Sequence, residues 1–450
     1  MTPAGLREEM QRVAERGDVA SFLRYARSVH PSDLSDVLAQ LDDELQLRVV
    51  QALPPEVVSE ALAEMEAEEH PEDVLAALRP EQAAGIVSEL EADDAADLIG
   101  DLPPDAARRI LSHVAVAERA DVERLLAYGE ETAGGRMTTA MITVPTAATL
   151  GEALESVRAQ AEDIEDFFQV YCVEPDGRLG GVLSLQRFVV AKPTRVVREV
   201  MEAPAALVTP DQDQEEVARL MARYNLPAMA VVDGLGRLLG RITFDDVIDV
   251  VEAESTEDLL KFGGVSGKEA LAATWQEAVR SRLPWLYVNL LTASAGATVV
   301  YVFQRTIADA VALAVWMPVV AGMGGNAGTQ ALAVTVRRIA LGLVPVGRRF
   351  SVVTKEVAVG VVNGLAVGVL VGLVAWLLGG HGWVLGAVVL FAMWGNLIVA
   401  AVAGSFVPLL LEKVGVDPAI ASSMFVTAFT DTIGFLLLLG LGSRVLAPGG

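Results

Sequence analysis

The chain of 450 residues is almost without cysteine. Cys172 is the single one, so neither an internal disulfide nor a cysteine-based zinc site can form. The four histidines never fall in the HExxH spacing of zinc proteases, which excludes an intramembrane zinc protease. Glu269 follows the glycine-rich stretch 263–268 where a phosphate-binding loop needs Ser or Thr, so that stretch indicates a linker. The first residues lack the apolar core of a signal peptide, so we expect the N-terminal part to stay cytoplasmic.

Basic residues are scarce in the first part of the chain, and charge of either sign is scarce in the second. From Arg280 onward lie 10 of the 34 basic and 5 of the 59 acidic residues, which leaves 24 and 54 for residues 1–279. The first part therefore carries a net charge of −30 and the second +5. This balance argues against a nucleic-acid partner and predicts a cation-binding surface ahead of a membrane part. Ordinary acidic bias with solvated carboxylates is the alternative.

Residues 1–128 predict an acidic domain of short helices. Leu-Pro openings recur, and apolar residues then follow at helical spacing. This pattern is typical of a small helical solenoid. The openings are Leu53-Pro54-Pro55, Leu78-Arg79-Pro80 and Leu102-Pro103-Pro104.

Residues 134–255 contain an internal duplication. The stretch 173–188 matches 232–247 at an offset of 59, and each copy predicts strand, glycine turn, strand and helix. The pair resembles tandem CBS (cystathionine-β-synthase) domains, with copies at 134–198 and 199–255. Such pairs often bind adenosyl nucleotides through Thr243-x-x-Asp246. Arg187 occupies the position that matches Asp246 in the first copy, so nucleotide (ATP) binding is doubtful here.

Carboxylates cluster on the last helix of the second copy and beyond it. Asp245, Asp249 and Glu252 share one helical face, and Glu254, Glu257 and Asp258 share another. Lys261 is the one basic residue within reach. Hard oxygen ligands suit Mg²⁺ or Ca²⁺, so we interpret the clusters as cation sites rather than solvated faces. We expect a connecting helix at 256–279.

The chain from 280 to 450 predicts five membrane-spanning helices. The first lies near 283–303 and the second near 310–336. The run 357–411 holds no Asp, Glu, Lys or Arg and is long enough for the third and fourth, and the fifth is 419–441. Basic residues lie before the first span and between the second and third, so we expect the N-terminus in the cytoplasm and the C-terminus outside. Single asparagines on other spans predict interhelical hydrogen bonds: Asn289, Asn363 and Asn396.

The fifth span carries one charge, Asp431, with Thr427 one turn earlier on the same face. A carboxylate inside a membrane costs about 2.5–3.5 kcal/mol, so it usually meets a cation or proton or a partner in a neighbouring helix. The second span contains Gly324-Gly325-Asn326-Ala327-Gly328-Thr329-Gln330. Its glycines favour close helix packing or backbone carbonyls bared to an ion, and Asn326 and Gln330 share one face.

These motifs, with Asp417-Pro418 and the run 425–435, resemble the MgtE family of magnesium channels over essentially the whole chain. The resemblance implies a multidomain α and α/β membrane protein: a cytosolic helical solenoid, a tandem CBS pair and a five-helix transmembrane domain. It implies a homodimer in the plasma (inner) membrane, with Mg²⁺ passing a pore at the dimer axis. Pore metal ligands would be Asp431, Thr427 and Asp417, with Gly325, Asn326 and Gln330 lining the path.

The resemblance further implies that Mg²⁺ bound between the cytosolic domains closes the pore. The matching sensor positions are Glu60, Asp93, Asp97, Asp213, Glu215, Asp246, Asp249, Glu254, Glu257 and Asp258. Two alternatives remain open. Asp431 could carry a proton or Na⁺ in a coupled transporter, or the chain could move other divalent cations such as Mn²⁺ or Co²⁺.

Overall fold

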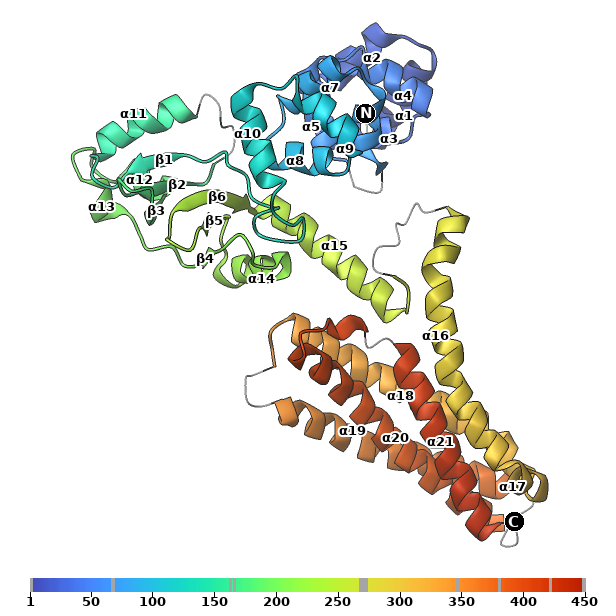
Figure 1. The fold of residues 1–450 in the computed structure, drawn as a ribbon. Helices are drawn as coiled ribbons and strands as arrows, with labels where there is room; N and C mark the ends of the chain where they lie inside the picture. Colours follow the sequence, from blue (N-terminus) through green and yellow to red (C-terminus); the bar gives the residue numbers. More distant parts are fainter. Residues whose placement is uncertain are drawn as a thin grey trace. The chain divides into compact units, whose positions relative to one another are not determined.

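The computed structural model describes residues 3–65, 69–161, 164, 167–266, 274–344, 349–378, 382–420 and 423–446 (Figure 1). The chain forms two compact units, residues 1–253 and 254–450. The first holds the acidic helices and the duplicated α/β region, and the second holds the long apolar helices.

Short helices fill the first 125 residues, as the Leu-Pro repeats predict. Proline occupies the first turn of α3, α5, α6, α7 and α9, where its missing N–H costs nothing. Successive odd-numbered helices from α3 to α9 pack on one another, and so do the even-numbered helices from α4 to α10, which confirms a solenoid. The helices are α1 (Pro3–Glu15), α2 (Val19–Ala26), α3 (Pro31–Ala39), α4 (Asp43–Val50), α5 (Pro55–Ala63), α6 (Pro71–Ala77), α7 (Pro80–Val87), α8 (Ala92–Gly100), α9 (Pro104–Leu111) and α10 (Val116–Leu125).

Two equivalent three-stranded sheets confirm the duplication. In each sheet the first two strands are parallel and the last two antiparallel. Gln169 pairs with Ser184 in one sheet and Ala228 with Thr243 in the other, which is the predicted 59-residue offset. The strands are β1 (Thr143–Pro145), β2 (Gln169–Val173), β3 (Leu179–Ser184), β4 (Leu207–Val208), β5 (Ala228–Val232) and β6 (Leu238–Thr243), with helices α11 (Leu150–Gln160), α12 (Leu185–Val190), α13 (Val197–Val200), α14 (Gln214–Tyr224) and α15 (Phe244–Phe262).

One hydrophobic core joins the helical domain to the second copy. Ile99 of α8, Val217 of α14 and Val250 of α15 are all buried in it, whereas the first copy has a core of its own. The shared core places the start of α15 beside the helices of the acidic domain. It therefore brings together carboxylates that lie about 150 residues apart in the sequence.

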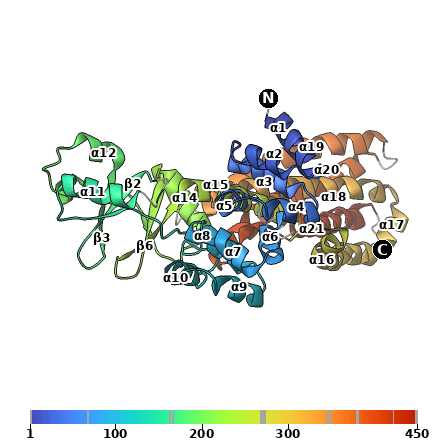
Figure 2. The ribbon, with the colours of Figure 1, turned by 90° about the horizontal axis from the view of Figure 1, so that it is seen from above.

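The second unit is built from long helices. α15 runs on to Phe262, α16 begins at Trp275, and residues 267–273 of the expected connecting helix lie outside the described residues. Figures 1 and 2 show α18 to α21 side by side. The helices are α16 (Trp275–Val302), α17 (Gln304–Asp309), α18 (Ala312–Ala340), α19 (Arg349–Leu378), α20 (Gly382–Lys413) and α21 (Ser423–Val445), with a short 3₁₀ turn, η2 (Pro418–Ile420).

Four of these helices are long and apolar enough to cross a membrane: α16, α19, α20 and α21. α18 is equally long, but its glycines and Asn326 lower its hydropathy. The count of five spans therefore stays a prediction. In the described residues, α18 packs along both α20 and α21, so it belongs to the same bundle.

Small residues let the apolar helices approach closely. Gly360, Gly364, Gly368 and Gly372 lie one turn apart on α19 and face α20, where added Cβ atoms would meet α20 atoms at 2.7–3.1 Å. Close backbone approach of this kind is what drives helix association in lipid. α19 and α20 thus form a tight pair that leaves α18 and α21 to carry the polar motifs.

Candidate metal sites and pore

A group of carboxylates gathers between α8 and α15, and we call it the acidic site: Asp93, Asp94 and Asp246, with Glu91 and Glu64. Asp93 is only 9% exposed, and its Oδ1 atom is buried without a hydrogen-bond partner among the described residues. Asp246 accepts a hydrogen bond from the Thr243 backbone N–H at 3.1 Å and another from the Thr243 hydroxyl. A buried carboxylate oxygen without a partner is costly unless a cation or proton meets it.

The acidic site shifts the pKa values of its members upward. Burial is the largest cause, and the neighbouring carboxylates add to it. The pKa of Asp94 is raised to about 8, that of Asp246 to about 6, and that of Asp93 well above its ordinary value. The site therefore holds protons near neutral pH, and a divalent cation would have to displace them.

Other predicted sensor residues border the acidic site, and the charge of Asp97 helps to raise the pKa of Asp94. Burial raises the pKa of Asp97 to about 6, although Asp97 pairs with Arg136 at 3.2 Å (Oδ2 to Nη1). Burial and then Glu64 raise the pKa of Asp249. In the described residues, no hydrogen bond or ion pair links the exposed Glu60 of α5 to this group.

Asp213 and Glu215 begin α14. The Asp213 side chain accepts the Glu215 backbone N–H at 2.9 Å, so Asp213 is a helix cap. Glu215 is exposed in the first turn of the helix. Neither residue belongs to the acidic site as the structure shows it.

A lysine bridges the remaining carboxylates at the end of α15. Lys261 Nζ lies 2.6 Å from Glu257 Oε1 and 2.6 Å from Asp417 Oδ2, and we call this set the Lys261 bridge. Burial alone would lower the pKa of Lys261, but these two hydrogen bonds raise it overall. Burial, and then the charge of Asp417, raises the pKa of Asp258. The sequence predicted Glu257 and Asp417 as cation ligands, and in the structure the ammonium group of Lys261 lies between them.

On α21, Asp431 is half-buried and Thr427 lies one turn before it. The Thr430 hydroxyl donates to the Thr427 carbonyl at 2.9 Å, and the Thr432 hydroxyl donates to the Ala428 carbonyl at 2.8 Å. Both hydroxyls therefore satisfy their own helix. Inside α21 the Thr427 carbonyl also accepts the helix's own i+4 backbone N–H, so both of its lone pairs are used within the helix in this structure.

The glycine-rich motif of α18 has two faces. Gly325 is buried against α21. A Cβ added there would lie 3.2 Å from Thr427 Cγ2, so the absence of a side chain at Gly325 allows α18 and α21 to pack closely. Gly322, Asn326 and Gln330 recur every four residues, and all three are exposed. They form a polar strip on an otherwise apolar helix, where lipid would be a poor neighbour.

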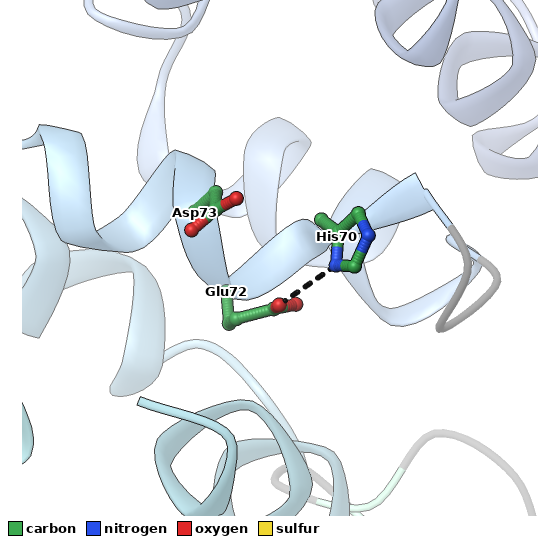
Figure 3. A group of neighbouring side chains, drawn as sticks. All are labelled: His70, Glu72 and Asp73. Atoms are coloured by element: carbon green, nitrogen blue, oxygen red, sulfur yellow. Dashed lines mark hydrogen bonds and ion pairs between the residues drawn. The ribbon is translucent and has the colours of Figure 1, made fainter. Parts of the chain in front are cut away.

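Figure 3 shows a separate group at the start of α6: His70, Glu72 and Asp73. Among the described residues this is the one group whose metal-ligand atoms lie within 4.8 Å of one another. His70 Nδ1 and Glu72 Oε1 are 3.1 Å apart. Carboxylates in a first helical turn are favourable by themselves because they face the positive end of the helix dipole, which accounts for Glu72 and Asp73 without a metal ion. The acidic site, by contrast, is more widely spaced in this conformation.

Known protein families match the helical domain, the second CBS copy and the long apolar helices of this chain. The family profile for divalent cation transporters (MgtE) matches residues 317–441, that for the MgtE intracellular N domain matches 29–131, and a CBS domain profile matches 197–253. The magnesium transporter MgtE of Thermus thermophilus is 35% identical and covers 97% of this chain and 98% of its own length. The chain belongs to the MgtE family.

The similarity to MgtE proteins extends through the cytosolic and membrane parts. The magnesium transporter MgtE of Bacillus subtilis is 29% identical over 96% of this chain. The solved cytosolic domain of the Mg²⁺ channel MgtE in complex with ATP is 36% identical, covers 54% of this chain and 99% of its own, and has a TM-score of 0.51. A solved soluble part of a magnesium transporter matches at 27% identity, over 56% of this chain and 99% of its own, with a TM-score of 0.52. Together with the four apolar helices, these matches indicate a multipass membrane protein.

Sequence reasoning found Asp93 and Asp246 of the acidic site but missed Asp94, Glu91 and Glu64. Asp94 was within reach of sequence reasoning, because it stands beside Asp93 in the first turn of α8. Glu64 follows α5 and Glu91 precedes α8, so tertiary packing alone brings them to the site.

Proposed function

We propose that the chain forms a homodimeric Mg²⁺ channel that imports Mg²⁺ down its electrochemical gradient and closes when Mg²⁺ binds its cytosolic part. The observation that carries this proposal is Asp431, a half-buried carboxylate on a helix apolar enough to span a membrane. The polar strip on α18 supports it. In this proposal the chain spans the inner membrane five times, with its N-terminus cytoplasmic and its C-terminus outside.

The ion path follows from the chemistry of Mg²⁺. This ion sheds water reluctantly and usually keeps several water ligands. Two Asp431 carboxylates, one from each protomer, would hold a hydrated ion, and the amides of Asn326 and Gln330 would bind its outer waters. Transport is then driven by the gradient alone, and the protein is not an enzyme.

Closure follows from the charge of the acidic site. Its carboxylates would repel one another if all were ionised, which is why they hold protons without a cation, and the orphan oxygen of Asp93 offers a ligand position in a buried setting. Mg²⁺ would relieve the repulsion and favour the compact arrangement, because it binds that arrangement better than an open one. The Lys261 bridge would add a contact between the end of α15 and the turn before α21.

An apolar groove supports the homodimer. It has a volume of about 330 Å³, lies between α14 and α15, and is lined by Met221, Phe244, Ile248 and Val251 among others. Phe244, Ile248 and Val251 are 42–56% exposed. A row of apolar side chains on neighbouring helices is suited to burial against a second copy.

The Thr243–Asp246 pair favours the metal site over a nucleotide site. The Thr243 hydroxyl is committed to Asp246, and Asp246 belongs to the acidic site. In the first copy, Arg187 pairs with Glu202 at 2.5 Å. ATP binding, which the solved relative shows for itself, is therefore not part of the proposal for this chain.

The test is Asp431→Asn in proteoliposomes, with Asp309→Asn as the matched control at the end of α17. The first change removes the charge and keeps the shape, so Mg²⁺ flux should fall by at least about tenfold without loss of the folded dimer. The control should transport as the wild type does. Normal flux from Asp431→Asn would refute the pore assignment.

The same vesicles separate the alternatives. A channel current that is independent of pH and Na⁺ gradients favours the proposal, and a current that follows either gradient favours coupled transport. A panel of Mg²⁺, Mn²⁺ and Co²⁺ measures selectivity, which ligand chemistry alone leaves open.

A further inference from the structure

Asn396 is a polar residue buried in the middle of α20. It is fully buried, and its Nδ2 donates a hydrogen bond to the Val320 carbonyl of α18 at 2.9 Å. This confirms the interhelical bond predicted from the sequence. Its Oδ1 atom is buried without a hydrogen-bond partner among the described residues.

Two glycines from two other helices flank this one amide. A Cβ added to Gly324 of α18 would lie 3.0 Å from Asn396 Cγ and closer still to Nδ2. A Cβ added to Gly434 of α21 would lie 2.7 Å from Nδ2 and 3.1 Å from Cγ. At Gly324 the three nearest atoms all belong to Asn396, so the space that this glycine leaves is filled by the amide.

The arrangement is poorly explained by packing alone. An amide whose oxygen is left unsatisfied in an apolar bundle costs stability, and an apolar side chain would fill the space without that cost. A planar amide is, however, thinner than a branched apolar group. It can lie between two glycine backbones and fix their separation.

We propose that Asn396 is a positioning residue for ion passage, because it sets the separation between α18 and α21. Those helices carry the polar strip and Asp431, so the inference rests on the function proposed above. Gly324 lies two residues before Asn326, and Gly434 lies three residues after Asp431. A change in the separation at this level moves both groups that face the ion.

The test is a double-mutant cycle of Gly324→Ala and Asn396→Ala, with Gly440→Ala and Asn363→Ala as matched controls. Gly440 has open space around it, and Asn363 is exposed on α19. Mg²⁺ and Mn²⁺ fluxes are measured per folded protein in proteoliposomes, and thermal melting reports stability. Mg²⁺ gives up its waters reluctantly, so the ratio of the two fluxes responds to the width of the path.

We expect Gly324→Ala to lower Mg²⁺ flux about tenfold and to change the flux ratio, because displacements of about 1 Å have effects of this size or larger. Asn396→Ala should also change the ratio. The double variant should recover most of the ratio lost in Gly324→Ala, since the new methyl group then occupies the space of the missing amide. Both controls should behave as the wild type.

Three results would overturn the proposal. The first is a double variant in which the two single effects on the flux ratio multiply and nothing is recovered. The second is a normal flux ratio in Asn396→Ala. The third is variants that lose folded protein while the flux ratio of the remaining folded protein is unchanged. If Gly324→Ala does not fold, Gly434→Ala tests the same amide from α21. Adding Asn396→Ala to that variant should then restore folding and the flux ratio, and the absence of such recovery refutes the proposal. Asp431→Asn is measured alongside these variants. Normal flux from Asp431→Asn would refute the pore assignment, whereas reduced flux from it leaves a negative result at Asn396 as a failure of the positioning role alone.

Discussion

Replacing Lys261 by methionine tests the proposed closure of the pore by the cytosolic part. Methionine keeps the apolar stem and removes the charge that bridges Glu257 and Asp417 at 2.6 Å each. A hydrogen bond between charged groups contributes about 1.5–3 kcal/mol in a buried setting. The side chains of the bridge are 22–34% exposed, so solvent screening reduces that contribution.

We take about 2 kcal/mol for the whole bridge, which corresponds to a factor of about 30 in the equilibrium between closed and open forms. The variant should therefore be up to about 30-fold more open than the wild type at the internal Mg²⁺ concentrations over which the wild type closes. The two carboxylates then face each other without the lysine, so millimolar Mg²⁺ should bind between them and restore closure. The closing transition becomes steeper in Mg²⁺.

The assay is Mg²⁺ flux in proteoliposomes at a series of internal Mg²⁺ concentrations. Lys413→Met, at the end of α20, is the control for loss of one positive charge near the membrane. Equal flux from Lys261→Met and the wild type at the internal Mg²⁺ concentrations over which the wild type closes would refute the closing role of the bridge. Failure to close at high Mg²⁺ would show that Lys261 cannot be replaced by the ion.

Two further predictions concern pH and topology. Asp94 and Asp246 have pKa values of about 8 and 6 when folded, against an ordinary value of 3.8, so the folded state binds protons that the unfolded chain releases. Without Mg²⁺, stability should fall as pH rises from 4 to 8, and Mg²⁺ binding at pH 7 should release protons; a melting temperature independent of pH would contradict this. A cysteine introduced at Gly449 should be labelled from outside the cell and one at Ser21 should not, whereas external labelling of both would indicate an even number of spans.

Local sequence signals predicted the elements well. The 59-residue offset predicted two sheets with equivalent registers, and the Leu-Pro openings predicted where several helices begin. Both signals depend on neighbours in the chain. The opposite roles of Gly325 and Asn326, one buried against Thr427 and one exposed, were not predictable, because they depend on which helix packs against α18.

The predicted sensor carboxylates show more clearly what the sequence alone could not distinguish. Charge clustering marked Asp213 as strongly as Asp246, yet Asp213 caps α14 and Asp246 joins the acidic site. Both residues lie at the start of a helix, Asp213 at the N-cap of α14 and Asp246 in the first turn of α15, and carboxylates are common at both positions whatever their role. Burial separates the two roles, and burial at Asp246 comes from the shared core that packs α15 beside α8.

The Lys261 bridge gives Mg²⁺ a second competitor in the proposed closure of the pore. From the sequence, Lys261 was only a neighbour of Glu257 one turn away, and Asp417 lies 156 residues further on. With one ammonium group between them, the two carboxylates are half-neutralised from within the chain, so Mg²⁺ must compete with a lysine there and with protons at the acidic site. The two competitors differ: protons at the acidic site are lost as pH rises toward 8, whereas Lys261 stays charged. Closure through the acidic site should therefore strengthen as pH rises, and the contribution of the bridge should not.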